Sequence, residues 1–95
     1  MKIYISGQIT GLPEQVAQAN FSAAVDKIRE WNHEPVNPFW LPHFHDKSWL
    51  NYMREDIKAL LDCEAIYMLP NWNESQGAKI ELSIAIQLGM KIIFE

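Results

Sequence analysis

Apolar and polar residues alternate along the chain in blocks that predict strands separated by helices. Short runs rich in β-branched, aromatic and other apolar residues cover residues 2–6, 34–38, 65–70 and 90–94. Between these runs, apolar residues recur three or four positions apart over residues 13–31, 49–62 and 77–89, which is the period of a helix. The alternation predicts an α/β fold with a parallel sheet of about four strands.

The first two predicted helices each carry one apolar face. On the first helix this face comprises Ala17, Phe21, Ala24, Ile28 and Trp31. On the second helix it comprises Leu50, Met53, Ile57, Leu60 and Leu61. Pro13 is expected in the first turn of the first helix, and Ser48 is expected as the N-cap of the second.

The third predicted helix places a carboxylate on the face that should pack against the core. Its polar stripe is formed by Lys79, Ser83 and Gln87, and the opposite stripe by Glu81, Ile84, Ala85 and Leu88. The helix dipole favours an ionised Glu81, whereas burial opposes ionisation, and a carboxylate held in that balance can act as a nucleophile or base. The alternative is a glutamate whose tip reaches solvent.

The loops after the predicted strands open onto one edge of the sheet, where ligands bind in such folds. Two glycines bracket the loop of residues 6–11, which indicates either a phosphate or ribose site or an ordinary connection. Its spacing matches neither a Rossmann fingerprint nor a P-loop. In the loop of residues 71–77, Ser75 and the backbone N–H groups from Gly77 onward can hold a hydroxyl or phosphate oxygen, or Ser75 can serve as an N-cap.

Asp56 lies at the border of the apolar face of its helix, on the side of Met53 and Leu60. Two carboxyl groups that flank one cleft suit reactions at the anomeric carbon of a sugar. From spacing alone, however, a solvated Asp56 paired with Arg54 or Lys58 is the favoured interpretation.

Composition excludes several classes of protein. The 95 residues suffice for one small domain, and 48% hydrophobic with 21% charged residues is a globular composition. A net charge of -4 argues against binding to nucleic-acid polymers or anionic membranes. No run of residues has the length of a membrane span or of a signal peptide, and the single cysteine, Cys63, fits the cytoplasm.

A histidine-rich and aromatic loop precedes the second helix. His43 and His45 are a weak metal signal because a metal site needs a supported third ligand, so we expect neither a metal ion nor a cofactor. The nearby aromatic residues Phe39, Trp40, Phe44 and Trp49 include candidates for the wall of a base-binding pocket.

Six short segments resemble one family in sequence and in order. They are residues 4–13 (YISGQITGLP), 37–38 (NP), 52–56 (YMRED), 63–66 (CEAI), 69–72 (LPNW) and 75–82 (SQGAKIEL). Over essentially its whole length the chain resembles the DUF4406 family of small bacterial and phage proteins. That family is similar to the nucleoside 2-deoxyribosyltransferase superfamily, which includes the 2′-deoxynucleoside 5′-phosphate N-hydrolases. The resemblance implies a single flavodoxin-like domain over residues 1–95, a three-layer α/β sandwich that forms dimers or higher oligomers.

The resemblance also implies roles for particular residues. In that superfamily the glutamate of a Gly-x-x-x-Glu-Leu segment attacks the anomeric carbon of deoxyribose, and Glu81 stands at this position. An aspartate about two dozen residues earlier protonates the leaving base, and Asp56 stands there. Tyr4 and Gly7 match residues that line the sugar. Six residues before the nucleophile, the transferases have an aspartate that contacts the sugar hydroxyl, and the hydrolases have a serine that holds a 5′-phosphate. This chain has Ser75 at that position.

The implied function is hydrolysis or transfer at the N-glycosidic bond of a 2′-deoxynucleoside 5′-phosphate, with a small deoxynucleotide or nucleoside as ligand. The expected substrate contacts are Tyr4, Ser6, Gly7, Gln8, Ile9, Gly11, Ser75 and Gly77. A non-catalytic nucleotide-binding module and a phage-type interaction protein are the alternatives. The chain departs from the hydrolases at Gln8, where they have serine, and Lys79 adds a positive charge near the nucleophile's turn. Because the sequence ends at Glu95, we expect the superfamily's contribution from a neighbouring C-terminal segment to be missing.

Overall fold

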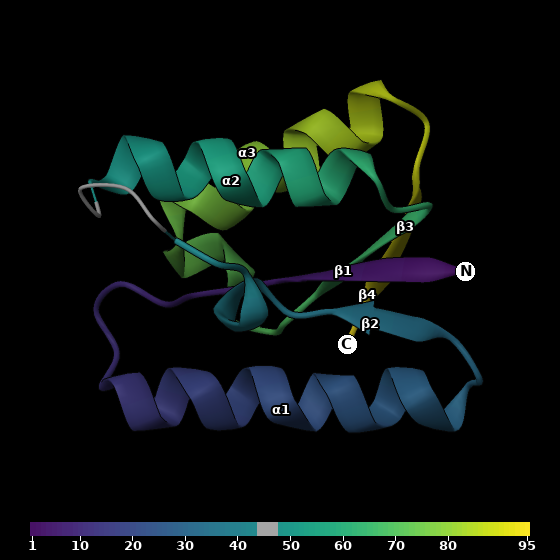
Figure 1. Ribbon diagram of the computed structural model, residues 1–95, viewed down its shortest axis with the longest axis horizontal. Helices are drawn as coiled ribbons and strands as arrows, with labels where there is room; N and C mark the ends of the chain where they lie inside the picture. The colour runs from purple at the N-terminus through teal and green to yellow at the C-terminus, as the bar shows by residue number, and fades with distance from the viewer. Residues whose placement is uncertain (44–47) are drawn as a thin grey trace.

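A computed structural model describes residues 1–43 and 48–95, and strands and helices alternate along it (Figure 1). The elements are β1 (Lys2–Ser6), α1 (Glu14–Glu30), β2 (Glu34–Val36), the 3-10 helix η1 (Pro38–Trp40), α2 (Trp49–Leu61), β3 (Ala65–Met68), the 3-10 helix η2 (Trp72–Glu74), α3 (Gln76–Gln87) and β4 (Lys91–Phe94). The four strands form a parallel sheet in the order β2-β1-β3-β4. The predicted parallel α/β architecture is therefore confirmed.

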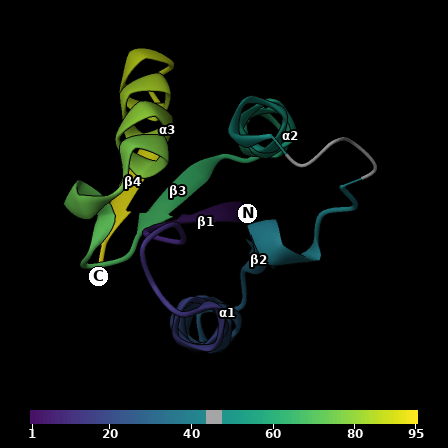
Figure 2. The ribbon, with the colours of Figure 1, turned by 90° about the vertical axis from the view of Figure 1, so that its left-hand side faces the viewer.

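Helices cover both faces of the sheet, with α1 on one face and α2 and α3 on the other (Figures 1 and 2). Successive residues of β1 point to opposite faces, as the pleat of a strand requires. Ile3 and Ile5 pack in one buried cluster with Phe21 of α1, whereas Tyr4 packs in the other with Leu82 of α3. The sheet is thus the middle of three layers, and a separate core lies on each side of it.

The ends of the helices follow from their capping residues. The Oγ atoms of Ser48 and Ser75 accept hydrogen bonds from the first turns of α2 and α3, which confirms Ser48 as an N-cap and the N-cap interpretation of Ser75. Pro13 is the N-cap of α1 and not a residue of its first turn, because its ψ of 138° is extended. Trp31, predicted on the buried face, follows the last residue of α1 and is 45% exposed.

The apolar faces of α2 and α3 are narrower than predicted. On α2 the buried residues are Met53 and Leu60, while Leu50 and Leu61 are exposed on the flank of the helix. Leu88 is also exposed, because it follows the last residue of α3 and lies beyond the part of the helix that packs on the sheet. The prediction that these three leucines belong to the core is wrong.

The strand order creates a topological switch between β1 and β3. From β1 the chain proceeds through α1 to β2 on one side, and it later returns to β3 on the other side. Connections that leave neighbouring strands toward opposite faces open a crevice at the carboxyl ends of the strands. Gly7 lies at this point, where a Cβ atom would meet the side chain of Leu69 at 2.6 Å. Only glycine allows the loop after β1 to pass so close to the end of β3.

Candidate active site

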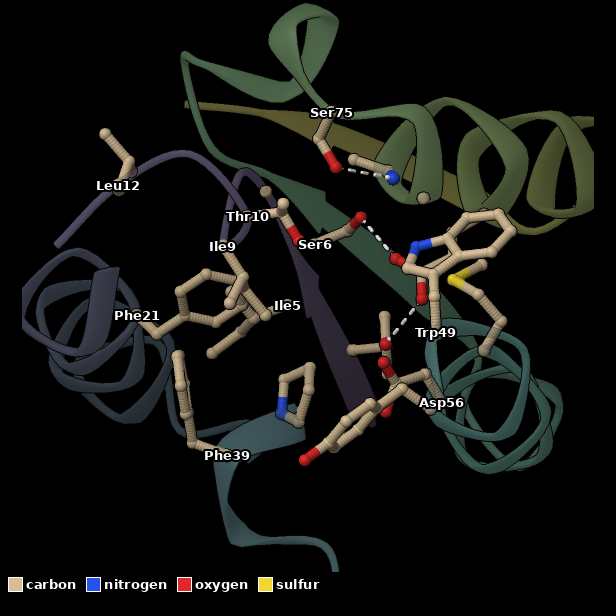
Figure 3. Close-up of a pocket in the computed structure, with 18 of the residues that line it drawn as sticks. Ile5, Ser6, Ile9, Thr10, Leu12, Phe21, Phe39, Trp49, Asp56 and Ser75 are labelled. Carbon is tan, nitrogen blue, oxygen red and sulfur yellow. Dashed lines mark hydrogen bonds between the residues drawn. The ribbon is translucent and has the colours of Figure 1, made fainter. Parts of the chain in front are cut away.

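A cavity of about 550 Å³ opens at the carboxyl end of β1 and is lined by residues of α1, α2, α3 and the connecting loops. Its wall has a polar and an apolar part. One polar part includes Tyr4, Ser6, Asp56, Ser75 and Glu81, the apolar part includes Ile5, Ile9, Leu12, Phe21 and Phe39, and α1 adds the polar Glu14 and Gln18. In Figure 3 Ile5, Ile9, Leu12, Phe21 and Phe39 lie on one side, and Asp56 and Trp49 lie on the other. The cavity can therefore offer both polar and apolar contacts to a ligand.

The carboxylate of Glu81 is held through both of its oxygens. The hydroxyl of Tyr4 donates to Oε2 at 2.7 Å, and the hydroxyl of Ser6 donates to Oε1 at 2.6 Å. Tyr4 and Ser6 are two positions apart in β1, so both side chains point to the face that α3 covers. Glu81 is only 5% exposed, and its carboxylate is fixed in place at the cavity wall. The alternative of a glutamate whose tip reaches solvent does not match this geometry.

The environment of Glu81 balances two opposing effects on its ionisation. Burial raises the pKa of Glu81 to about 7, although the hydrogen bonds from Ser6 and Tyr4 lower it. The pKa of Tyr4 itself is raised well above its usual value, first by burial and then by the charge of Glu81. Tyr4 consequently keeps its proton and remains a hydrogen-bond donor throughout the physiological pH range.

Asp56 faces the same cavity from α2 (Figure 3). Its Oδ1 atom is buried and has no hydrogen-bond partner among the described residues. Burial raises the pKa of Asp56 to about 7, and the negative charge of Glu81 contributes to the same rise. Among the described residues Asp56 forms no ion pair with Arg54 or Lys58, and Arg54 instead donates to Asn51 at 2.7 Å.

The two carboxyl groups differ in the form that their surroundings stabilise. Two hydroxyl donors stabilise the charged form of Glu81. Among the described residues the buried Oδ1 of Asp56 has no such donor, so the proton is better kept on Asp56. A pair with separated roles of this kind can supply an anionic nucleophile and a general acid.

Most of the predicted substrate contacts line the cavity, but two do not. Ser6, Gly7, Ile9, Ser75 and Gly77 belong to its wall, together with Tyr4. Gln8 instead holds loops together, because its backbone N–H donates to Asn71 Oδ1 at 3.1 Å and its side chain donates to the carbonyl of Thr10 at 3.2 Å. Gly11 is outside the wall and forms a turn with a positive φ of 92°.

Aromatic side chains close the remaining part of the cavity. Phe39 and Trp49 were predicted as candidate walls and do line it, whereas Trp40 does not. Tyr52 and His43 also line it, with ring centroids 4.6 Å apart, and Tyr52 was not among the predicted site residues. Its spacing could have identified it, because a residue four positions before Asp56 lies on the same helix face. Phe44, His45 and Asp46 lie outside the described residues.

Two further properties hold for the part of the chain that the structure describes. No group of three or more His, Cys, Asp or Glu side chains there is placed to hold a metal ion. None of its helices combines the length and the apolar character that crossing a membrane requires.

Comparison with known proteins places this geometry in a context. The family model described as "Domain of unknown function (DUF4406)" matches residues 1–94. The structure of a 2-deoxyribosyltransferase from the psychrotolerant bacterium Bacillus psychrosaccharolyticus is similar, with a TM-score of 0.73 and 20% identity over 99% of this chain and 71% of that protein. A 2-desoxiribosyltransferase from Leishmania mexicana gives a TM-score of 0.73 and 20% identity over 98% of this chain and 62% of that protein. A search of the curated proteins finds no match. The chain thus has the α/β fold of these transferases.

Proposed function

We propose that this chain, which belongs to the DUF4406 family, cleaves the N-glycosidic bond of a 2′-deoxynucleoside or its 5′-phosphate. The deoxyribosyl group then passes to water or to another base. The shared fold with 2-deoxyribosyltransferases supports the reaction class. The observation that carries the proposal is the pair of carboxyl groups on one cavity wall, with Glu81 held by two hydroxyls and Asp56 without a donor to its buried Oδ1 among the described residues.

In the first step, the Glu81 carboxylate attacks C1′ of the deoxyribose. A bond forms between a Glu81 oxygen and C1′, and the bond between C1′ and the base nitrogen breaks. The electron pair of that bond stays on the base, which takes the proton from the Asp56 carboxyl group. The products of this step are a deoxyribosyl ester of Glu81, an ionised Asp56 and a free base.

In the second step, an acceptor releases the sugar. Asp56 removes a proton from water or from the N–H of another base, and the acceptor atom bonds to C1′ as the ester bond to Glu81 breaks. This step restores the starting protonation of both carboxyl groups. Water as acceptor gives hydrolysis, and a base as acceptor gives transfer.

Ser75 lines the cavity from the side of α3 and is the contact to the sugar that we propose. Its Oγ already accepts a hydrogen bond from the N–H of Ala78 at 3.1 Å, so the hydroxyl hydrogen is available as a donor toward the cavity. The N–H of Gly77, in the first turn of α3, lies beside it on the wall. Ser75 and Gly77 therefore form the proposed contact to the 5′ side of the sugar.

The test is incubation of the purified protein with a panel of 2′-deoxynucleosides and their 5′-monophosphates, each with and without a second free base. Chromatography then measures released base and newly formed nucleoside. We expect base release by the wild type, and a loss of at least about a thousandfold in Glu81→Ala because the nucleophile is removed.

The matched control is Glu30→Gln, which removes an exposed carboxylate from the last position of α1, away from the cavity. Release unaffected by Glu81→Ala would contradict the assignment of the nucleophile. No release from any substrate, combined with tight binding of nucleosides, would instead indicate a non-catalytic binding module. The homo-oligomer and the cytoplasmic location stay predictions, and light scattering checks the first.

A further inference from the structure

Part of the backbone of the loop between β1 and α1 is already hydrogen-bonded within the protein. The N–H of Gln8 donates to Asn71, and the N–H of Leu12 donates to the carbonyl of Ile9 at 3.3 Å. Pro13 has no N–H to offer. Two of the backbone donors at this glycine-bracketed loop, those of Gln8 and Leu12, are thus already engaged within the protein and cannot serve a phosphate.

The first turn of α1 carries its own negative charge. Glu14 is the first residue of α1 and lines the cavity. A carboxylate at this place interacts favourably with the positive end of the helix dipole, so it occupies the end that would otherwise attract a phosphate. Gln18, one turn later, donates to Glu14 Oε1 at 3.3 Å and supports this position.

The cavity wall as a whole is acidic. Three of its side chains end in carboxyl groups, namely Glu14, Asp56 and Glu81, and no lysine or arginine occurs among the wall residues that the structure describes. The formal net charge of the whole chain is also negative, at -4. A 5′-phosphate, with nearly two negative charges at neutral pH, would meet the charges of Glu14 and Glu81 without a lysine or arginine among the described wall residues to offset the repulsion.

The N-terminus of α3 favours a phosphate, but its effect is weaker than that of the carboxylates on the wall. The N-terminus of α3 contributes about half a positive charge, together with the Ser75 hydroxyl. Full carboxylate charges on the same wall exceed that partial charge. A neutral 5′-hydroxyl avoids the conflict, because it accepts a hydrogen bond from Ser75 and can donate one to a carboxylate.

We propose that the substrate is an unphosphorylated 2′-deoxynucleoside, and that Glu14 is a specificity-determining residue that selects against a 5′-phosphate. This inference rests on the proposed function and narrows its substrate class. It differs from the expectation based on Ser75 alone, because the charges on the rest of the wall outweigh that one serine.

The test compares 2′-deoxyadenosine with 2′-deoxyadenosine 5′-monophosphate in the wild type, in Glu14→Gln and in the matched control Glu30→Gln. Both variants remove one carboxylate from α1, but Glu30 lies at the other end of the helix and is not on the cavity wall. We expect kcat/KM for the nucleoside to exceed that for the monophosphate by about tenfold or more in the wild type. Glu14→Gln should reduce this preference by about two- to fivefold, and Glu30→Gln should leave it unchanged. Raised ionic strength should reduce it as well.

A monophosphate that reacts as fast as the nucleoside, or faster, overturns the inference. Equal effects of the two variants would also overturn it, since a general change in charge would then explain the selection. If no base is released from either compound, calorimetric titration of the same two ligands decides. Tighter binding of the nucleoside upholds the inference while the proposed catalysis fails, whereas tighter or equal binding of the monophosphate, or binding of neither, overturns the inference.

Discussion

At the scale of single residues, the two hydroxyls of β1 govern how Glu81 ionises. Burial alone would hold the carboxyl group protonated at neutral pH, and the donors Tyr4 and Ser6 counteract this effect. Ser6 is itself only 1% exposed, and its hydroxyl donates to the glutamate. We infer that Ser6 positions Glu81, while its predicted contact to the substrate stays a prediction.

Substitution of Ser6 by alanine tests this role. Loss of a donor to the charged form should raise the pKa of Glu81 by about one pH unit, because a hydrogen bond to a charged group contributes roughly 1.5 to 3 kcal/mol. The acid limb of the pH–rate profile should then move to higher pH, with activity about tenfold lower at pH 6. Carbon NMR titration of the Glu81 carboxyl group measures the same change without turnover.

Ser6→Thr keeps a hydroxyl and should restore the wild-type acid limb in part. Ser83→Ala, at an exposed position of α3, should leave it unchanged. A Ser6→Ala enzyme with an unshifted profile but a uniformly lower rate would show that Ser6 acts through packing only.

The sequence predicted some of these residues better than others. The helical period alone placed Glu81 on the inner side of its helix, since that property depends on spacing within α3. The contact between Ser6 and Glu81 joins residues 75 positions apart, so no local pattern reports it. Asp56 looked like a solvated border residue because spacing within one helix cannot show that its Oδ1 atom is buried in the folded chain.

At the scale of elements, α2 and α3 each begin at a serine that caps the helix, but the two serines differ in their position relative to the cavity. Ser48 caps α2 and Ser75 caps α3, each by accepting a hydrogen bond from the backbone N–H three residues later. Each cap should contribute about 1 kcal/mol to stability. Of the two serines, Ser75 alone belongs to the cavity wall.

Alanine substitution of the two serines should therefore separate stability from activity. Both Ser48→Ala and Ser75→Ala should lower the free energy of unfolding by about 1 kcal/mol, measured by urea denaturation. Ser75→Ala should in addition raise KM about tenfold, because one contact to the sugar is lost. An equal effect of the two variants on KM would argue against a substrate contact by Ser75.

Sequence patterns predicted each helix but overestimated how much of it is buried. The predicted face of α2 included Leu50 and Leu61, yet the helix is buried through Met53 and Leu60. Helical periodicity reports which residues share a side, but the width of the buried stripe depends on the neighbours that cover it. Here Leu50 and Leu61 share the side of the predicted face, but each is 54% exposed.

At the scale of the whole molecule, the buried carboxyl groups link stability to pH. The pKa values of Asp56 and Glu81 rise to about 7 from ordinary values of 3.8 and 4.5, so the folded chain binds more protons than the unfolded chain within this interval. The contribution of these groups to stability is full below about pH 4 and is lost as pH rises through 7.

Replacement of Asp56 by asparagine should remove part of this dependence. Thermal or urea unfolding of Asp56→Asn should show a gain of about 1 kcal/mol over the wild type at pH 8, and a smaller difference at pH 5. Asp26→Asn, which changes an exposed residue of α1, should follow the wild-type pH dependence. Parallel curves for the wild type and Asp56→Asn would show that Asp56 ionises alike in the folded and unfolded chains.

The sequence predicted a parallel sheet but not the order of its strands. Alternation of strands and helices requires crossover connections, whereas the side of β1 on which β3 pairs depends on contacts across the whole chain. That pairing places the switch beside Gly7, and so it determines where the cavity opens. The site is in this sense a property of topology more than of any one motif.

The alternation of β1 has a consequence for how the protein tolerates insertions and deletions. Ile3 and Ile5 belong to the core against α1, while Tyr4 and Ser6 reach Glu81 on the opposite face. Loss or gain of one residue within this strand would exchange the two sets, and hydroxyls would enter the apolar core while isoleucines met the carboxylate. Burial of the two isoleucines thus fixes the face of the sheet to which the two hydroxyls point. Correct packing of β1 therefore also positions the hydrogen-bond donors of Glu81.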